Sequence, residues 1–319
     1  MPTVLVTSRS FSTGASDVER RLVDAGLLVA RGPATHELAA LTPMLSDAVA
    51  WVAGTGPVTA EHLDRAPGLR VVARYGVGVD AVDLAAARAR GIVVTNTPGA
   101  NSDAVADHTV ALLLAALRGV VAGDRRVRAG DWRVERSREV ASLRVGLIGV
   151  GRIGRGVARR LAGFDAVVCG IDPHVTDEEL AALGIVSGAD AIPADVDVAC
   201  LHTPGPGLIV DAEWIARARP GLILVNTARG SLVDEHAVAE GLRQGQLAAY
   251  ATDTLAAEGG IVTSPLLDQD IADRVVVSPH WAAQTVEAVD RMGSMAVDSV
   301  LDVLAGRVPR DVVEGSGSV

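Results

Sequence analysis

The most informative part of the sequence is Leu143–Arg155, which reads Leu-Arg-Val-Gly-Leu-Ile-Gly-Val-Gly-Arg-Ile-Gly-Arg. A short apolar run, Val145–Ile148, leads into Gly149-x-Gly151-x-x-Gly154, and apolar residues at helical spacing follow. In such a motif the first glycine allows a tight turn, the second admits a pyrophosphate, and the third lets a helix pack on the strand. The helix start offers free N–H groups and about half a positive charge. The stretch predicts a dinucleotide-binding strand, turn and helix.

An acidic residue in the right place strengthens this prediction. The motif alone is weak evidence, because a chain with 34 glycines produces such spacings by chance. The next apolar run, Ala166–Ile171, ends in Asp172, 18 residues after Gly154. A carboxylate there accepts hydrogen bonds from both hydroxyls of an adenosine ribose and repels a 2′-phosphate. Asp172 therefore favours NAD over NADP.

Strand-like runs and helical patterns alternate in two series, which predicts parallel α/β structure. In the first series the strand-like runs are Val4–Thr7, Leu27–Ala30, Ala48–Ala53, Val71–Arg74 and Ile92–Thr95, with helical patterns near Asp17–Ala25, Ala60–Arg65 and Leu84–Arg90. In the second they are Val145–Ile148, Ala166–Ile171, Val196–Leu201, Leu222–Asn226, Ala249–Thr252 and Val275–Val277. Six strands that open with a glycine turn predict a doubly wound dinucleotide-binding domain.

The ends of the two series set the expected domain bounds. The helical pattern Thr285–Leu304 is expected to pack back on the first series, so that residues 1–99 and 285–319 form one discontinuous domain and residues 100–284 the dinucleotide domain. The helix Ala104–Leu117 is apolar on nearly every side, which predicts burial either between the domains or against a second subunit. We therefore expect a helical linker or dimerisation segment at residues 100–130. The Gly/Ser-rich Glu314–Val319 is predicted to be disordered.

The charge balance and the cysteine content limit the expected partners and cellular location of the protein. The chain of 319 residues carries 29 Lys and Arg against 39 Asp and Glu, a net charge of −10, which argues against nucleic acid and anionic membranes as partners. The two cysteines, Cys169 and Cys200, lie in apolar runs and are expected to be buried thiols, neither a bridge nor metal ligands. No leader or membrane-spanning pattern is evident, and we expect a cytoplasmic enzyme without a metal.

Polar residues follow four strands of the second series. These segments are His202-Thr203-Pro204, Thr227-Ala228-Arg229, Asp253 through Glu258, and Pro279-His280. Ligands of doubly wound sheets bind outside the carboxyl ends of the strands, so the arginine, glutamate and histidine should converge there. Each of the three alone equally fits an ordinary loop or turn residue. Together, at strand ends beside a dinucleotide turn, they predict a site.

The predicted set suits hydride transfer to a 2-oxo acid. Arg229 would hold a substrate carboxylate, because its planar fork matches two oxygens. His280 would donate a proton to the carbonyl oxygen as hydride reaches C2, and in the reverse direction its neutral imidazole would be the base. Glu258 would bind the other ring nitrogen, fix the tautomer and raise the histidine pKa.

These residues carry a resemblance to a known family. The chain resembles the D-isomer-specific 2-hydroxyacid dehydrogenases over nearly its whole length, close to the branch of phosphoglycerate dehydrogenases and hydroxypyruvate reductases. The matching segments are Tyr75–Asp80, Thr95–Gly99, Ala104–His108, Gly149–Gly154, Asn226–Gly230, Thr252 through Glu258, and Ser278–His280. The resemblance implies two flavodoxin/Rossmann-like α/β domains with doubly wound parallel sheets and a cleft between them, and a homodimer.

The resemblance also assigns roles by position. Arg229, Glu258 and His280 match the family's catalytic residues. Its NAD contacts match the glycine motif and Arg152, Ile153, Asp172, Thr203, Thr227 and Asp253, the last holding the nicotinamide carboxamide. The backbone at Val77 and Gly78 would bind the substrate carboxylate, as loop amides do.

Departures from the family leave the substrate open. Residues Gly205–Gly207 form a shorter loop than the family has, and Gly259 stands where proline is common. Arg74 lies where phosphoglycerate dehydrogenases carry a phosphate-facing arginine, but Ala53–Thr55 lacks a second one. We expect a small anionic 2-oxo acid, such as hydroxypyruvate, glyoxylate, or a phosphorylated or phosphono analogue, and do not favour 3-phosphoglycerate.

Two other functions fit the same fold. An NAD-sensing binding protein similar to the C-terminal-binding-protein corepressors is disfavoured by the intact Arg229, Glu258 and His280. A phosphite dehydrogenase uses the same three residue types, and an assay with phosphite and NAD distinguishes it. The expected activity remains an NAD-dependent D-2-hydroxyacid dehydrogenase, a 2-oxo acid reductase.

Overall fold

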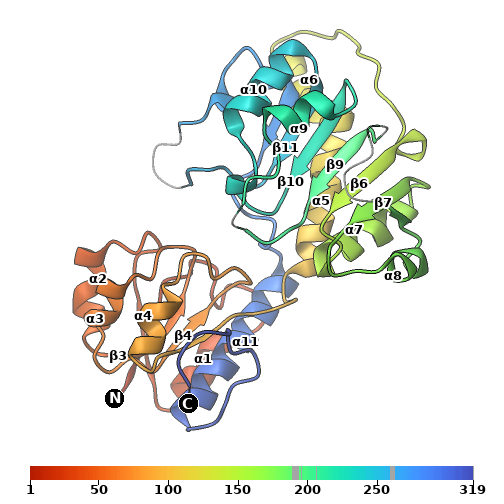
Figure 1. The fold of residues 1–319 in the computed structure, drawn as a ribbon. Coiled ribbons are helices and arrows are strands. Elements are labelled where there is room, and N and C mark those ends of the chain that lie inside the picture. Colours follow the sequence, from red (N-terminus) through yellow and green to blue (C-terminus); the bar gives the residue numbers. More distant parts are fainter. Residues whose placement is uncertain (189–193, 195, 206, 259–262, 319) are drawn as a thin grey trace. The chain divides into compact units, whose positions relative to one another are not determined.

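A computed structural model describes residues 1–188, 194, 196–205, 207–258 and 263–318 (Figure 1). The chain forms two compact units, Met1–Asn101 with Ala283–Val319, and Ser102–Ala282. The predicted bounds, 99/100 and 284/285, lie within two residues of these junctions. Each unit has its own parallel sheet.

The first unit is built on a five-stranded parallel sheet in the order β2-β1-β3-β4-β5. Its strands are β1 (Thr3–Val6), β2 (Leu28–Arg31), β3 (Ala48–Ala53), β4 (Val71–Arg74) and β5 (Val93–Thr95), and its helices are α1 (Val18–Asp24), α2 (Leu38–Leu45), α3 (Ala60–Asp64), α4 (Leu84–Ala89) and α11 (Val286–Leu304). This strand order is that of flavodoxin-like folds, in which ligands bind where the order reverses, between β1 and β3.

Alternation along the strands sends side chains to both faces of this sheet. On one face Leu5, Trp51 and Val72 are fully buried in a cluster with residues of α2 and α3. On the other face α11 packs against β4 and α1. The helical pattern of the C-terminal segment thus returns to the first unit, and Thr285 caps α11 by accepting the Ala288 N–H.

The chain end is ordered along β5, which corrects the prediction of disorder for Glu314–Val319. Val313 donates its N–H to Val94 O at 2.8 Å, and Gly317 donates to Ile92 O at 2.9 Å. A Cβ at position 317 would lie 2.6 Å from the carbonyl carbon of Gly91, so only glycine fits this approach. The glycines that predicted disorder instead let the tail lie against the sheet edge. Val319 itself lies outside the described residues.

The second unit holds a seven-stranded parallel sheet in the order β12-β11-β10-β9-β6-β7-β8. Its strands are β6 (Arg144–Ile148), β7 (Val167–Ile171), β8 (Val186–Ser187), β9 (Val198–Leu201), β10 (Leu222–Asn226), β11 (Leu247–Thr252) and β12 (Val275–Val277). Its helices are α5 (Ser102–Leu117), α6 (Val120–Arg128), α7 (Arg152–Ala162), α8 (Asp177–Ala182), α9 (Ala212–Arg217) and α10 (Glu235–Gln244). Short 3₁₀ turns η1–η4 lie at Val140–Ser142, Gly230–Leu232, Pro265–Leu267 and Ala272–Arg274. The order reverses between β6 and β9, as in Rossmann folds, with β12 added at one edge. The two-residue β8 is the strand that the sequence pattern did not predict.

Two apolar layers sandwich this sheet. Leu147, Cys200 and Val225 face α5 and α7, while Leu201 and Leu224 face the layer with α9 and α10. Strands buried on both faces read as continuous apolar runs, as the sequence shows.

The helix α5 packs on α7 and on strands β10 to β12 of its own unit. Its composition predicts burial on every side, but Ala111 is exposed. After a break at Gly119, whose φ is +58°, α6 continues in a new direction. Within the described part of the chain no lone helix meets the length and hydropathy needed to cross a membrane; α5 and α6 meet it only as a pair bent by 56°.

Candidate active site

The three glycines of the turn after β6 lie in different environments. Gly149 has φ +96°, and a Cβ there would lie 2.8 Å from the His202 carbonyl carbon. A Cβ at Gly154 would lie 2.3 Å from Gly149 O, whereas one at Gly151 would meet nothing within 4 Å. The first and third glycines thus permit close packing, and the second leaves open space. This cradle fits the pyrophosphate of a dinucleotide.

Asp172 lies beside this turn. One of its carboxylate oxygens accepts the Val150 N–H at 2.8 Å, and the other accepts the His174 N–H at 2.9 Å. These bonds hold the half-buried carboxylate at the end of β7, next to the start of α7 at Arg152. The position fits the predicted contact with an adenosine ribose.

The other predicted cofactor residues have differing environments. Arg152 is exposed in the first turn of α7, and Ile153 packs at the edge of the core. The buried Thr203 hydroxyl has no hydrogen-bond partner within the described residues. The Thr227 hydroxyl is paired with that of Thr109 on α5 at 2.8 Å. Their contacts with a cofactor stay predictions.

His202 lies against the glycine turn, and both of its ring nitrogens are buried. Neither ring nitrogen of His202 has a hydrogen-bond partner among the described residues. Burial lowers its pKa to about 4, so the ring is neutral. A charged imidazole would be unfavourable in this dry position.

His280 and Glu258, predicted to act together, form a hydrogen-bonded pair. Nδ1 of His280 lies 2.6 Å from Oε2 of Glu258. The glutamate is the main cause that raises the His280 pKa above its ordinary value, against the opposing effect of burial. His280 has φ +51°, a left-handed conformation that costs a non-glycine residue roughly 1–2 kcal/mol. Such strain persists where the surrounding structure fixes it.

The loop after β10 positions Arg229. The Asn226 side chain accepts the Ala228 N–H at 3.0 Å and donates to Arg229 O at 2.8 Å, an Asx turn that shapes the loop. A Cβ at Gly230 would lie 2.2 Å from the Leu255 backbone, so glycine lets the loop that carries Glu258 lie on this one. The charge of Arg229 acts on His280 and lowers its pKa somewhat. The three predicted catalytic residues therefore lie in one neighbourhood.

The shortened loop after β9 approaches the same arginine. A Cβ at Gly205 would lie 3.3 Å from Cγ of Arg229. Pro206, in the middle of that loop, and Gly259, after Glu258, lie outside the described residues.

Asp253, predicted to hold the nicotinamide carboxamide, is 2% exposed. Burial opposes its ionisation, but His108, whose Nε2 lies 3.5 Å from Oδ1, and hydrogen bonds from Ser278 and the backbone hold its pKa below the ordinary value. Its carboxylate is thus an anion occupied by groups of this chain. Contact with a cofactor stays a prediction.

In the first unit the loop after β4 has the carbonyls of Tyr75, Gly76 and Val77 bound, while the amides of Val77 and Gly78 are open. Arg74 donates to Tyr75 O at 2.8 Å, Thr97 donates to Gly76 O at 3.0 Å, and Asn96 donates to Val77 O at 2.7 Å. No hydrogen bond within the described residues uses the N–H of Val77 or Gly78. Consecutive open N–H groups form an anion-binding concavity.

The position of Arg74 differs from that expected of a substrate ligand. The residue is 8% exposed, and its guanidinium donates to Ala53 O and Tyr75 O. Arg74 therefore stabilises the loop after β4 through its hydrogen bond to Tyr75 O. A direct contact with substrate stays a prediction.

Three polar residues that shape the site have no role that the sequence predicts: Asn96, Asn226 and His108, whose ring bonds Ser278. Each belongs to a segment that carried the family resemblance. For the asparagines the signal is their place at strand ends, where Asn favours Asx turns. For His108, a polar residue in the otherwise apolar α5 is the signal.

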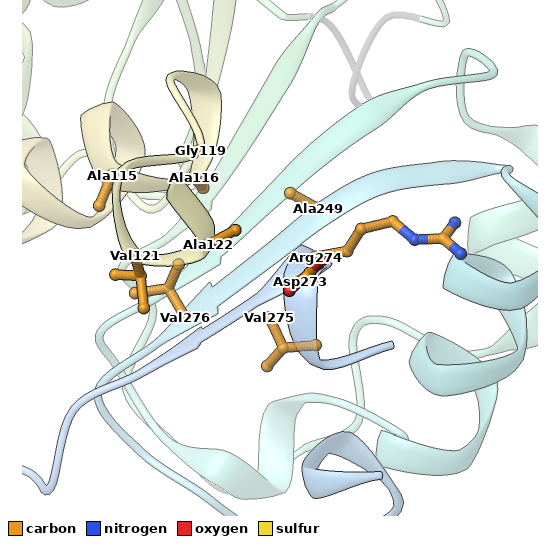
Figure 2. A pocket seen from close by; sticks show the side chains of 10 residues that line it. All are labelled: Ala115, Ala116, Gly119, Val121, Ala122, Ala249, Asp273, Arg274, Val275 and Val276. Atoms are coloured by element: carbon orange, nitrogen blue, oxygen red, sulfur yellow. The ribbon is translucent and has the colours of Figure 1, made fainter. Parts of the chain in front are cut away.

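The cavity in Figure 2 is not the site. It lies between α5, α6 and the β11–β12 edge, and it is lined by Ala115, Ala116, Gly119, Val121, Ala122, Ala249, Asp273, Arg274, Val275 and Val276. Its volume of about 10 Å³ is near the minimum for one water. Among the described residues no group of three or more His, Cys, Asp or Glu is arranged to hold a metal ion.

Known proteins are similar to this chain in sequence. Residues 110–282 match the NAD-binding domain of the D-isomer specific 2-hydroxyacid dehydrogenases. The D-3-phosphoglycerate dehydrogenase of Mycobacterium leprae (strain TN) is 40% identical over 100% of this chain, which spans 60% of the length of that relative. The glyoxylate reductase of Korarchaeum cryptofilum (strain OPF8) is 35% identical over 81% of this chain and 80% of its own.

Solved structures are also similar to this chain. A crystal structure of a Thermus thermophilus protein has a TM-score of 0.84 at 36% identity, covering 98% of this chain and 99% of that one. The family model covers more than half of the residues, and the relatives extend the likeness over the first unit. The chain belongs to the D-isomer specific 2-hydroxyacid dehydrogenase family.

Proposed function

We propose that the protein is an NAD-dependent oxidoreductase that transfers hydride between NAD(H) and C2 of a small acidic D-2-hydroxy acid and its 2-oxo acid. The observation that carries this proposal is the His280–Glu258 pair at 2.6 Å with Arg229 in its neighbourhood. The relatives are named dehydrogenase and reductase of such acids, which supports the same chemistry.

His280 moves the proton. With Glu258 on Nδ1, the Nε2–H faces away from the carboxylate and is the proton to be donated. During reduction the imidazolium gives it to the substrate carbonyl oxygen, and during oxidation the neutral ring accepts the hydroxyl proton. The bound nicotinamide supplies or accepts the hydride.

Cationic and amide groups hold the substrate carboxylate. We propose that Arg229 binds it through its planar fork and, from the family resemblance, that the open amides of Val77 and Gly78 bind an anionic group of the substrate. Asn96 and Arg74 keep the carbonyls of that loop turned away from the anion. A small 2-oxo acid such as hydroxypyruvate or glyoxylate fits these groups.

The cofactor is proposed to be NAD, held at the glycine turn. Gly149, Gly151 and Gly154 leave room for the pyrophosphate, and α7 presents its N-terminus there. Asp172 would accept hydrogen bonds from the ribose hydroxyls and repel a 2′-phosphate. Arg152, Ile153, Thr203, Thr227 and Asp253 are the further contacts that we propose from the family resemblance.

A substrate panel tests the proposal. We expect the purified protein to oxidise NADH with at least one small acidic 2-oxo acid, followed by the loss of NADH absorbance. Oxidation of phosphite with NAD, and no turnover of 2-oxo acids, would make it a phosphite dehydrogenase. NAD(H)-dependent capture of a protein partner without any turnover would make it a nucleotide sensor.

We further propose a homodimer through α6 and the segment that follows it. Val120, Val121, Val127, Trp132 and Val134 are exposed there, Val134 by 95%. Exposed apolar side chains gathered on one segment mark a protein interface. Light scattering should give the mass of a dimer for the wild type and of a monomer for a Trp132→Ser, Val134→Asp variant. Trp281→Ser, which removes another exposed tryptophan, is the control that should stay dimeric. A monomeric wild type would refute this interface.

A reducing compartment suits both cysteines, which are buried free thiols as predicted. We propose a cytoplasmic location and, from the net charge of −10, no nucleic-acid or membrane partner. Cell fractionation tests the location.

A further inference from the structure

The turn that carries His280 is hydrogen-bonded to Asp253. Three successive N–H groups of the turn, those of His280, Trp281 and Ala282, donate to Asp253. The first reaches its main-chain O at 2.9 Å, the second Oδ1 at 3.1 Å and the third Oδ2 at 2.9 Å. Since His280 is in the left-handed region, these bonds are what fixes its unusual backbone conformation.

Two further residues fix the orientation of the Asp253 carboxylate. The Ser278 hydroxyl lies 2.5 Å from Oδ1 of Asp253, and Nε2 of His108 lies 2.8 Å from the same hydroxyl oxygen. Because a carboxylate only accepts, Ser278 donates to it. The serine oxygen then accepts from His108, which must carry its proton on Nε2. The relay runs from α5, through Ser278, to the aspartate.

The Asp253 carboxylate has few hydrogen-bonding positions left for a ligand. With Ser278 and two backbone amides bound and 2% of the residue exposed, both oxygens are engaged within the chain. The geometry therefore gives Asp253 a second task besides the predicted cofactor contact, which is to hold the turn. The relay reaches His280 through the backbone and touches neither its ring nor Glu258.

We propose that Ser278 and His108 are positioning residues for proton transfer, which orient the Asp253 carboxylate so that the turn presents His280 to Glu258 and to the reacting oxygen. This inference rests on the proposed function for its kinetic consequence. Loss of the Ser278 hydroxyl removes the shorter of the two hydrogen bonds to Oδ1 of Asp253, which keeps the Trp281 N–H at 3.1 Å. It also removes the acceptor that lies 2.8 Å from Nε2 of His108, which then has only Oδ1 of Asp253 at 3.5 Å. The turn then relaxes, and a small displacement of a catalytic group slows a reaction strongly.

Paired variants test the relay. Ser278→Ala and His108→Leu remove its donors, whereas Ser278→Thr keeps the hydroxyl and His108→Gln keeps an N–H near the Nε2 position. We expect the first pair to lower kcat roughly tenfold to a hundredfold, with KM for NADH changed by less than about twofold. The conservative pair should recover most of the loss. Ser299→Ala, a buried serine on α11, is the matched control and should keep wild-type kcat.

A spectroscopic readout separates this inference from the proposed function. The His280 ring is faced by Glu258, Asp253 and Arg229, and Glu258 has the largest effect on its pKa. An NMR titration of the histidine Cε1–H signals, assigned with His280→Asn, should show the His280 pKa falling in Ser278→Ala and returning in Ser278→Thr. An unchanged His280 pKa together with unchanged kcat in Ser278→Ala would overturn the relay. A wild type that turns over no 2-oxo acid would refute the proposed function while the titration still decides the relay.

Discussion

Nδ1 of His280 lies 2.6 Å from Oε2 of Glu258, and the two residues come from separate loops after β11 and β12. The charge of Glu258 stabilises the imidazolium, because a neighbouring anion favours a protonated ring. Its place on Nδ1 leaves Nε2–H as the donor. The pair thus combines a fixed tautomer with a raised pKa, which are the two properties that a general acid needs near neutral pH.

Glu258→Gln should move the pH profile of the reaction. Reduction requires the protonated ring, so kcat/KM for the 2-oxo acid falls as pH rises through the raised His280 pKa. Without the glutamate charge that pKa drops and the fall moves to lower pH, each unit costing about tenfold at high pH. Rate measurements across pH check this. Glu213→Gln, which alters an exposed glutamate on α9, should leave the profile in place. An unmoved profile in Glu258→Gln would contradict the assigned pairing.

Arg229→Lys should impair the enzyme although charge is kept. A lysine cannot reproduce the two parallel hydrogen bonds of a guanidinium to a carboxylate. Loss of one bond to a charged group is worth about 1.5–3 kcal/mol, or roughly tenfold to a hundredfold in kcat/KM. Steady-state kinetics with the best 2-oxo acid measure it, with Arg217→Lys on α9 as the exposed control. Equal kcat/KM in Arg229→Lys and wild type would exclude two-point anchoring.

Asp172 should decide between NADH and NADPH. The wild type is expected to prefer NADH, since the carboxylate accepts from the ribose hydroxyls and repels a 2′-phosphate. Asp172→Asn removes the charge but keeps an oxygen for the Val150 N–H, so the turn stays formed. The NADH/NADPH ratio of kcat/KM should fall at least about tenfold, by the weakening of charged hydrogen bonds. A wild type that uses both cofactors equally well would contradict this role.

Gly149→Ala should lower the stability of the protein by more than the strain of its positive φ alone would. Gly149 and Gly245 both have positive φ, +96° and +76°, so alanine is strained at either position. Only at 149 does the new Cβ meet backbone, 2.8 Å from the His202 carbonyl carbon; at 245 nothing lies within 4 Å. Gly245→Ala should lose about 1–2 kcal/mol of stability, and Gly149→Ala more, with weakened NADH binding. Thermal unfolding and NADH titration compare the two; equal losses would show that the contact does not matter.

Much of the fold follows from local patterns. The runs Ala48–Ala53, Val71–Arg74 and Leu222–Asn226 are strands with the predicted bounds, because buried parallel strands are continuous apolar runs. The run Val275–Val277 is also a strand with the predicted bounds, although it is only partly buried at the sheet edge. Hydrophobic patterns did not predict the segments that are short, contain a proline or depend on close packing. β8 has two residues, α2 contains Pro43, and the chain end lies along β5 through glycine contacts that composition cannot indicate.

The proximity of Arg229, Glu258 and His280 could be predicted from the sequence, but the bonds that support these residues could not. Arg229, Glu258 and His280 stand past strand ends, where topology brings them together. The bonds of Asn96 to Val77, Asn226 to Arg229 and His108 to Ser278 join positions whose contact depends on loop conformation and helix docking. Such contacts are set by tertiary packing, which the spacing of residue types does not contain.

The proton-transfer role of His280 can be measured in the His280→Ala variant. NADH oxidation by the wild type and the variant would be followed at saturating 2-oxo acid, with NADH dissociation constants measured in parallel. We expect a loss in kcat of at least about a hundredfold, the lower range of general acid catalysis, with NADH affinity retained. Turnover within about twofold of wild type would contradict it, since this is far below what acid catalysis contributes.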